Sequence, residues 1–171
     1  MWETIADEAA RESPLWADSL KAADERRPEP VFSSLVSEEL ALGVETIYEG
    51  YLVHYGKSQL FSPPNADTAL LLGDSLYAQG LVHIAATGNV DAVADLAELI
   101  SLCSQARAEG RNGDGAAWAA TAARLGAGGL DDAREALRMD ADPSGLDDAA
   151  RASAGNESVD RALAAHALLI G

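Results

Sequence analysis

The chain has 171 residues, which is enough for one domain with a hydrophobic core of its own. Its 12 basic and 28 acidic residues give a formal net charge of −16. Because this charge repels phosphate backbones and anionic lipid surfaces, the composition argues against nucleic-acid binding and against electrostatic docking on a membrane.

Three further features concern the location of the protein. Cys103 is the only cysteine, so no disulfide can form within the chain, as is usual in the reducing cytoplasm. Residues 1–8 lack the basic segment and apolar run of a signal peptide. No apolar run reaches the roughly 18 residues that cross a bilayer. We therefore expect a cytoplasmic protein without a membrane span.

Residues 1–30 are predicted to form a short helical segment followed by a proline-containing linker. Ser13 and Pro14 have the spacing of an N-cap followed by proline at the first helical position. Pro28 and Pro30 then end the helix, because a proline forces the residue before it out of the α-helical region.

The predicted core domain, residues 31–126, begins with a helix over 34–55. Gly43 and Gly50 share a face of this helix, and they either admit a second helix closely or are simply tolerated. Glu38, Glu45 and Glu49 form a polar stripe, which we expect to face solvent. The apolar stripe repeats at steps of three and four residues and consists of Leu40, Val44, Ile47, Tyr48, Tyr51 and Tyr55.

Two longer helices are predicted over 66–87 and 90–108. The first is apolar on most sides, with a polar stripe from Ser75 to Gln79, His83 and Thr87, so we expect it to be central and largely buried. The second is amphipathic, with Cys103 on its apolar face, where a thiol is expected to be inert.

The C-terminal region, residues 127–171, changes in character. The sequence GLDDA at 129–133 recurs at 145–149, and both copies are typical of helix starts. These short, Ala-rich helices are expected to pack loosely. Since no segment shows the alternating pattern of a strand, the chain is predicted to be an all-α antiparallel helical bundle.

Few residues suggest chemistry by themselves. Asp74 falls on an apolar helix face, which favours a tie between helices over a ligand or metal site. None of the three histidines lies in the Glu-x-x-His motif of di-iron bundles. Asp131, Asp132 and Glu135 match DDxxE, a candidate Mg²⁺ motif, although acids at a helix start are favoured without any metal.

Two stretches resemble the polyprenyl diphosphate synthase family. Residues 45–56 read ETIYEGYLVHYG and are similar to the family helix that ends in Leu-Val-His before the DDxxD metal motif. Residues 70–81 read LLLGDSLYAQGL and are similar to the next family helix, with its apolar-Gly-Asp-x-Leu pattern. Over residues 36–109, the resemblance is closest to the small, non-catalytic component (component I) of two-component heptaprenyl diphosphate synthases.

The departures from the family pattern concern its metal ligands. Tyr55, Gly56 and Gln59 stand where the family has the acidic residues of DDxxD. Only 19 positions separate Tyr55 from Asp74, so the segment that carries a basic diphosphate-binding motif in active members is shortened away. Without carboxylates to hold Mg²⁺, a departing diphosphate is not stabilised. The resemblance therefore implies a truncated isoprenoid synthase fold whose catalysis is lost, with no catalytic residue and no cofactor.

The expected function is that of a partner or regulatory subunit in prenyl diphosphate synthesis, bound to a catalytic prenyl synthase subunit or paired as a homodimer. Three alternatives stay open. The chain is a small isoprenoid-binding helical protein, or a prenyltransferase that uses Mg²⁺ on Asp131, Asp132 and Glu135, or a helical structural domain. The residues expected to line the binding surface or interface are Tyr48, Tyr51, Leu52, Tyr55, Asp74 and Tyr77.

Overall fold

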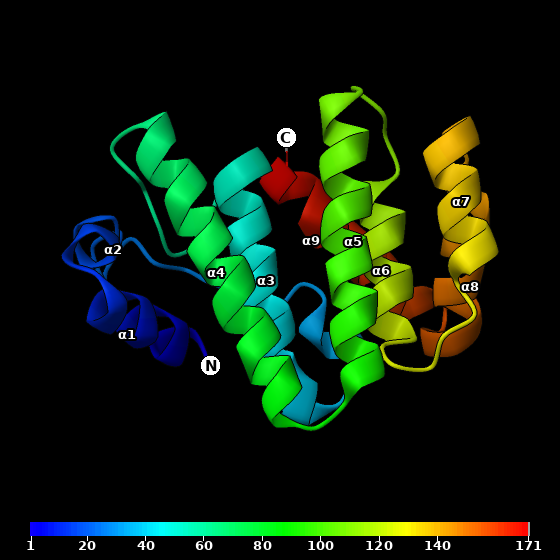
Figure 1. Cartoon of the computed structure of the whole chain (residues 1–171), viewed down its shortest axis with the longest axis horizontal. Coiled ribbons are helices and arrows are strands. Elements are labelled where there is room, and N and C mark those ends of the chain that lie inside the picture. The colour runs from blue at the N-terminus through cyan, green and yellow to red at the C-terminus, as the bar shows by residue number, and fades with distance from the viewer. Residues whose placement is uncertain (171) are drawn as a thin grey trace.

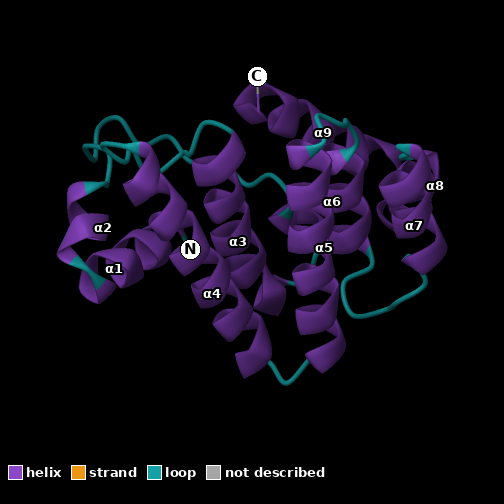
Figure 2. Ribbon diagram, turned by 45° about the horizontal axis from the view of Figure 1, so that its top comes forward, coloured by secondary structure: helices purple, strands orange, loops and turns teal. Residues whose placement is uncertain are grey.

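The structure is a computed structural model that describes residues 1–170. Those residues form helices joined by loops, and no strand is drawn among them in Figure 2. The predicted all-α class is therefore confirmed. One isolated antiparallel bridge joins Leu20 to Phe61.

The helices follow one another with short connections. They are α1 (Trp2–Glu12), α2 (Pro14–Asp18), the 3₁₀ turn η1 (Ser33–Leu35), α3 (Glu38–Tyr55), α4 (Ala66–Ala86), α5 (Val90–Ala108), α6 (Asp114–Ala123), α7 (Asp131–Asp140), α8 (Ser144–Ala154) and α9 (Asn156–Ile170).

The arrangement is a row of helices around the pair formed by α3 and α4 (Figure 1). The N-terminal helices α1 and α2 lie at one end of the row, beside α4. The helices α5 and α6 lie on the other side, and α7 and α8 form the opposite end. The last helix, α9, returns from that end towards α3.

Glycines let α3 and α4 approach each other closely. A Cβ atom on Gly43 would lie 3.0 Å from the backbone oxygen of Gly80, and one on Gly50 would lie 2.9 Å from that of Gly73. These distances are shorter than van der Waals contact, so larger residues would force the helices apart. Of the two interpretations of Gly43 and Gly50, close helix approach is confirmed.

The central helix is α3, and not α4 as expected from hydropathy. Eleven of the 18 residues of α3 are buried, against five of the 21 residues of α4. The expected solvent-facing stripe of α3 is also corrected, because Glu45 and Glu49 are fully buried. Hydrogen bonds from loop backbone groups make that burial possible.

The N- and C-terminal regions both pack against this centre. A small apolar cluster joins Ile5 and Trp16 to Leu72 and Leu76 of α4. At the other end, apolar residues of α7, α8 and α9 belong to the same buried cluster as α3, α5 and α6, which differs from the loose packing expected there. They include Leu137, Leu146, Ala150, Val159 and Ala162.

Candidate functional site

Tyr55, Gly56 and Gln59, which the resemblance led us to align with the DDxxD motif, are engaged in contacts within the chain. The hydroxyl of Tyr55 donates a 3.3 Å hydrogen bond to Ser104 on α5. Gly56 lies against the end of α9, where an added Cβ would be 2.8 Å from the oxygen of Leu169. The Gln59 side chain exchanges hydrogen bonds of 2.9 and 3.1 Å with the backbone of Glu29. The corner formed by Tyr55, Gly56 and Gln59 is thus covered by α9 and by the N-terminal linker.

Glu49 fixes the loop that follows this corner. Its carboxylate accepts hydrogen bonds from the Ser58 hydroxyl at 2.6 Å and from the backbone N–H groups of Gln59 and Leu60. Burial raises the pKa of Glu49 to about 7, although these hydrogen bonds lower it in part. Glu49 is therefore an anchor for the loop, and all its donors come from within the chain.

Glu45 holds the entry to η1 in the same way. One oxygen, Oε1, accepts hydrogen bonds from the backbone N–H groups of Val31, Phe32 and Ser33 at 2.8 to 3.0 Å. The other oxygen, Oε2, is buried without a hydrogen-bond partner among the described residues. Burial raises the pKa of Glu45, and the backbone donors oppose that shift. Glu45 therefore holds the backbone of residues 31–33 through one oxygen.

A polar cluster lies in the core between α3, α5, α6 and α9. The Tyr51 hydroxyl donates to the Asp114 carboxylate, which also pairs with Arg107. Arg107 Nε donates to the Tyr51 oxygen at 2.9 Å. Tyr48 and His166 share a 2.9 Å hydrogen bond, and His166 Nε2 lies 3.5 Å from Asp114 Oδ2. The cluster ties four helices together around one carboxylate.

The electrostatics of this cluster favour a structural role. Burial alone would raise the pKa of Asp114, but hydrogen bonds from His166 and Tyr51 and the charge of Arg107 hold it well below its usual value. Burial raises the pKa of Tyr48 and of Tyr51, so both phenols stay protonated. The two phenols are therefore neither proton acceptors near neutrality nor exposed nucleophiles.

Aromatic rings fill the space around the cluster. The ring of Tyr48 lies 5.0 Å from both Phe32 and Trp118, and the Tyr51 ring lies 5.5 Å from Trp118. Tyr48, Tyr51 and Leu52 are therefore core residues and are not on the surface, where an interface with another protein would need them.

Asp74 and Tyr77 both meet His54 on α3. Asp74 Oδ1 lies 3.2 Å from His54 Nε2, and the Tyr77 ring lies 5.2 Å from that imidazole. Burial lowers the pKa of His54, against the opposing charge of Asp74. Asp74 therefore lies beside α3 at the edge of the protein, where its side chain is 65% exposed, and its role as a tie between helices stays a prediction.

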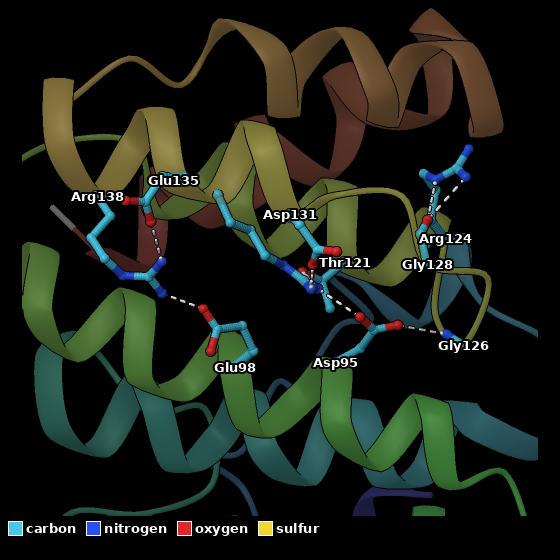
Figure 3. A network of polar contacts seen from close by, with 10 residues as sticks. Asp95, Glu98, Thr121, Arg124, Gly126, Gly128, Asp131, Glu135 and Arg138 are labelled. Carbon is cyan, nitrogen blue, oxygen red and sulfur yellow. Dashed lines mark hydrogen bonds and ion pairs between the residues drawn. The ribbon is translucent and has the colours of Figure 1, made fainter.

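The DDxxE candidates lie on α7, beside arginines (Figure 3). Asp131 is exposed and lies 4.0 Å from Arg134, while Glu135 pairs with Arg138 at 3.1 Å. The same arginines reach across to α5, where Arg134 contacts Asp95 at 2.9 Å and Arg138 contacts Glu98. These ion pairs tie α7 to α5. Among residues 1–170, no three His, Cys, Asp or Glu side chains converge as metal ligands, Asp132 included.

The most unusual surface is the outer face of α4, which we define as Leu70, Leu71, Ala78, Val82 and Ala85. Leu70, Leu71 and Val82 are 56%, 57% and 67% exposed. Residues 75–90, which include Ala78, Val82 and Ala85, contain no Asp, Glu, Lys or Arg in a protein of net charge −16, and the exposed Asp74 lies between this stretch and Leu70 and Leu71. Exposed apolar surface of this kind marks contact sites in soluble proteins.

A groove of about 450 Å³ adjoins this face, between α1 and α4. Ala78 and Val82 form its apolar wall, and polar side chains form the rest. Sequence analysis missed it, because the α1 residues lie far along the chain from the Ser75, Gln79 and His83 stripe that they meet. The polar lining residues are Glu8, Glu12, Ser75, Gln79 and His83.

The hydropathy of α4 also bears on the expected absence of a membrane span. By length and composition, α4 is the one helix within residues 1–170 that could cross a membrane, with a mean hydropathy of 1.2 over 18 residues. Only 28% of that window is buried in the protein. The absence of a membrane span stays a prediction, because core helices of soluble proteins meet the same criterion.

Comparison of the chain with protein-family models, with curated proteins and with solved structures found no match. A function can therefore only be proposed, from the geometry above and from the resemblance expected for residues 36–109.

Proposed function

We propose that the protein is a non-catalytic helical subunit that binds another protein through the outer face of α4. The observation that carries this proposal is the exposure of Leu70, Leu71 and Val82 on one helix of a strongly acidic chain. Covering such side chains removes apolar area from water, which stabilises association by about 25 cal/mol per Å² before the costs of binding.

The proposed partner is a catalytic prenyl diphosphate synthase subunit. Support comes from the resemblance of residues 36–109 to the small component of two-component enzymes. Support also comes from Tyr55, Gly56 and Gln59, which stand at the expected metal motif. Their contacts with α5, α9 and the N-terminal linker cover that corner of the protein. A homodimer is the second candidate partner, and the aromatic filling of the core gives the isoprenoid-binding alternative less support.

The test uses the purified chain and the purified catalytic prenyl synthase subunit from the same source. Size-exclusion chromatography with light scattering measures complex formation, and diphosphate release from allylic and homoallylic substrates with Mg²⁺ measures turnover. We expect a complex, and turnover by the catalytic subunit that changes when this chain is added. Separate elution with unchanged turnover would refute the proposed partner, and diphosphate release by this chain alone would refute its non-catalytic role.

A further inference from the structure

The groove between α1 and α4 presents hydrogen-bond acceptors that the chain itself leaves open. His83 Nε2 and Glu8 Oε2 are 2.7 Å apart, and no donor of residues 1–170 forms a hydrogen bond with Glu8 Oε1. Glu12 Oε2 accepts from Ser75 at 2.7 Å and from Gln79, which again leaves Oε1 open. One carboxylate oxygen of Glu8 and one of Glu12 can therefore accept hydrogen bonds from a ligand in the groove.

Gln79 also lines the groove and holds one of its carboxylates in place. Its Nε2 atom donates to Glu12. Its Oε1 atom is buried away from solvent and has no hydrogen-bond partner among the described residues, so the groove presents only the carboxylate oxygens of Glu8 and Glu12 to a ligand. The donor groups that line the groove are already directed at Glu8 and Glu12. The acceptors and the negative charge of the groove therefore favour a ligand that donates several hydrogen bonds and carries positive charge.

An arginine or lysine side chain has both properties, and its aliphatic stem suits the apolar wall of Ala78 and Val82. The wall is continuous with the outer face of α4, because Ala78 and Val82 belong to both. A single segment of a partner protein can therefore cover the apolar face and place a cation in the groove.

A second copy of this chain fits that description poorly. Its net charge of −16 repels another copy. Most of its arginines are already paired with carboxylates of the same chain, including Arg107, Arg134, Arg138 and Arg151. The charge of the groove is complementary to a basic partner.

We propose that the groove of Glu8, Glu12 and Gln79 receives an arginine or lysine side chain from a basic amphipathic segment of the partner, whose apolar residues cover the outer face of α4. This inference rests on the proposed function and names the chemistry of the partner segment, whichever protein carries it.

The test uses a synthetic amphipathic helical peptide of Leu, Ala and Arg and the same peptide with citrulline at each Arg. Citrulline keeps the shape and removes the charge. Binding to the full chain is measured by fluorescence anisotropy at physiological salt. We expect Glu8→Gln with Glu12→Gln to weaken binding of the Arg peptide roughly tenfold, as expected for lost charge-assisted hydrogen bonds. The citrulline peptide should bind all variants equally weakly.

The matched control is Asp131→Asn with Asp132→Asn, which removes the same charge from exposed positions on α7. Its effect should stay below about twofold, as expected when only long-range screened attraction is lost. Equal losses in the two double variants would overturn the proposal, because they would indicate attraction to net charge alone. If the groove variant fails to fold, Val82→Arg places a cation at the groove from an exposed position, and it should block the peptide.

Two other outcomes would also refute the inference. Binding of the citrulline peptide as tight as that of the Arg peptide would exclude a cation site. Binding of free spermidine at the groove as tight as that of the peptide, seen as the same shift of the Gln79 side-chain amide signal in an NMR spectrum, would indicate a small-molecule site. The peptide experiment contains no prenyl synthase subunit, so its failure is distinct from failure of the proposed partner.

Discussion

Gly80 of α4 lies directly against Ile47 of α3. A Cβ atom on Gly80 would be 2.4 Å from Ile47 Cγ1 and 2.8 Å from the backbone oxygen of Gly43. The second contact is with backbone, which cannot move aside as a flexible side chain can. The close approach of the two helices therefore depends on the absence of a side chain at Gly80.

Gly80→Ala is expected to destabilise the protein by about 2–4 kcal/mol. The added methyl group forces the two helices apart, and the free energy lost in packing is larger than the free energy gained from the higher helix propensity of Ala. Urea unfolding followed by circular dichroism measures the change. The matched control is Ala85→Gly at an exposed position of the same helix, which should cost only about 1 kcal/mol. A Gly80→Ala variant as stable as the wild type would contradict the packing described here.

The stability of the protein should depend on pH through Glu49. The carboxyl group has a pKa of about 7 in the folded protein against an ordinary value of 4.5, so between these pH values the folded state binds more protons than the unfolded state. The free energy of unfolding therefore falls as the pH rises from 5 to 8, by at most about 3 kcal/mol from this group.

Glu49→Gln removes this contribution, so the difference between wild type and variant should change across that pH range. Comparing the two proteins cancels the opposite contribution of His54, whose pKa is lowered in the folded state. Parallel stability curves for wild type and Glu49→Gln would show that the buried carboxyl does not titrate in this window.

Two substitutions of Glu45 test whether it stabilises the fold as a hydrogen-bond acceptor or through its charge. Glu45→Gln keeps an acceptor for the N–H groups of Val31, Phe32 and Ser33 and should change stability at pH 7 by less than about 1 kcal/mol. Glu45→Ala leaves those buried donors without an acceptor and should cost about 3 kcal/mol or more. Similar losses in the two variants, measured by urea unfolding, would mean that the charge matters and not the acceptor.

Removing the charge of Asp114 should be costly. Asp114→Asn leaves Arg107 and the Tyr51 hydroxyl without their carboxylate, and losing hydrogen bonds to a charged group in a part-buried site costs about 2–3 kcal/mol. The control, Glu157→Gln, removes an exposed pair with Arg161 and should leave the thermal midpoint unchanged. An Asp114→Asn protein with wild-type stability would contradict the central role of this cluster.

Local patterns allowed the helices to be predicted well. Helix α5 spans Val90–Ala108 as expected, and α4 ends one residue before the expected Thr87. Their starts are marked by Asn65 and Asn89, whose side chains accept hydrogen bonds from Thr68 and Ala92. Caps and apolar periodicity lie within a few residues of each other, so one sequence suffices to find them.

Burial depended on contacts that are distant in sequence. Tyr51 meets Asp114 63 positions away, and Glu8 meets His83 75 positions away. Glu45 and Glu49 looked like solvent-facing acids, because their donors are backbone groups of loops that leave no pattern of side chains. The apolar composition of α4 predicted a buried helix, but no other helix in the described part of the chain covers its outer face.

The central proposal is that a partner protein binds the outer face of α4. Leu71→Glu places a charge there, and Met139→Glu on α7 is its control, since Met139 is 65% exposed on a different surface. Co-elution with the catalytic prenyl synthase subunit measures both. We expect Leu71→Glu to abolish the complex and Met139→Glu to leave the complex intact. An intact complex with Leu71→Glu would contradict the proposed interface.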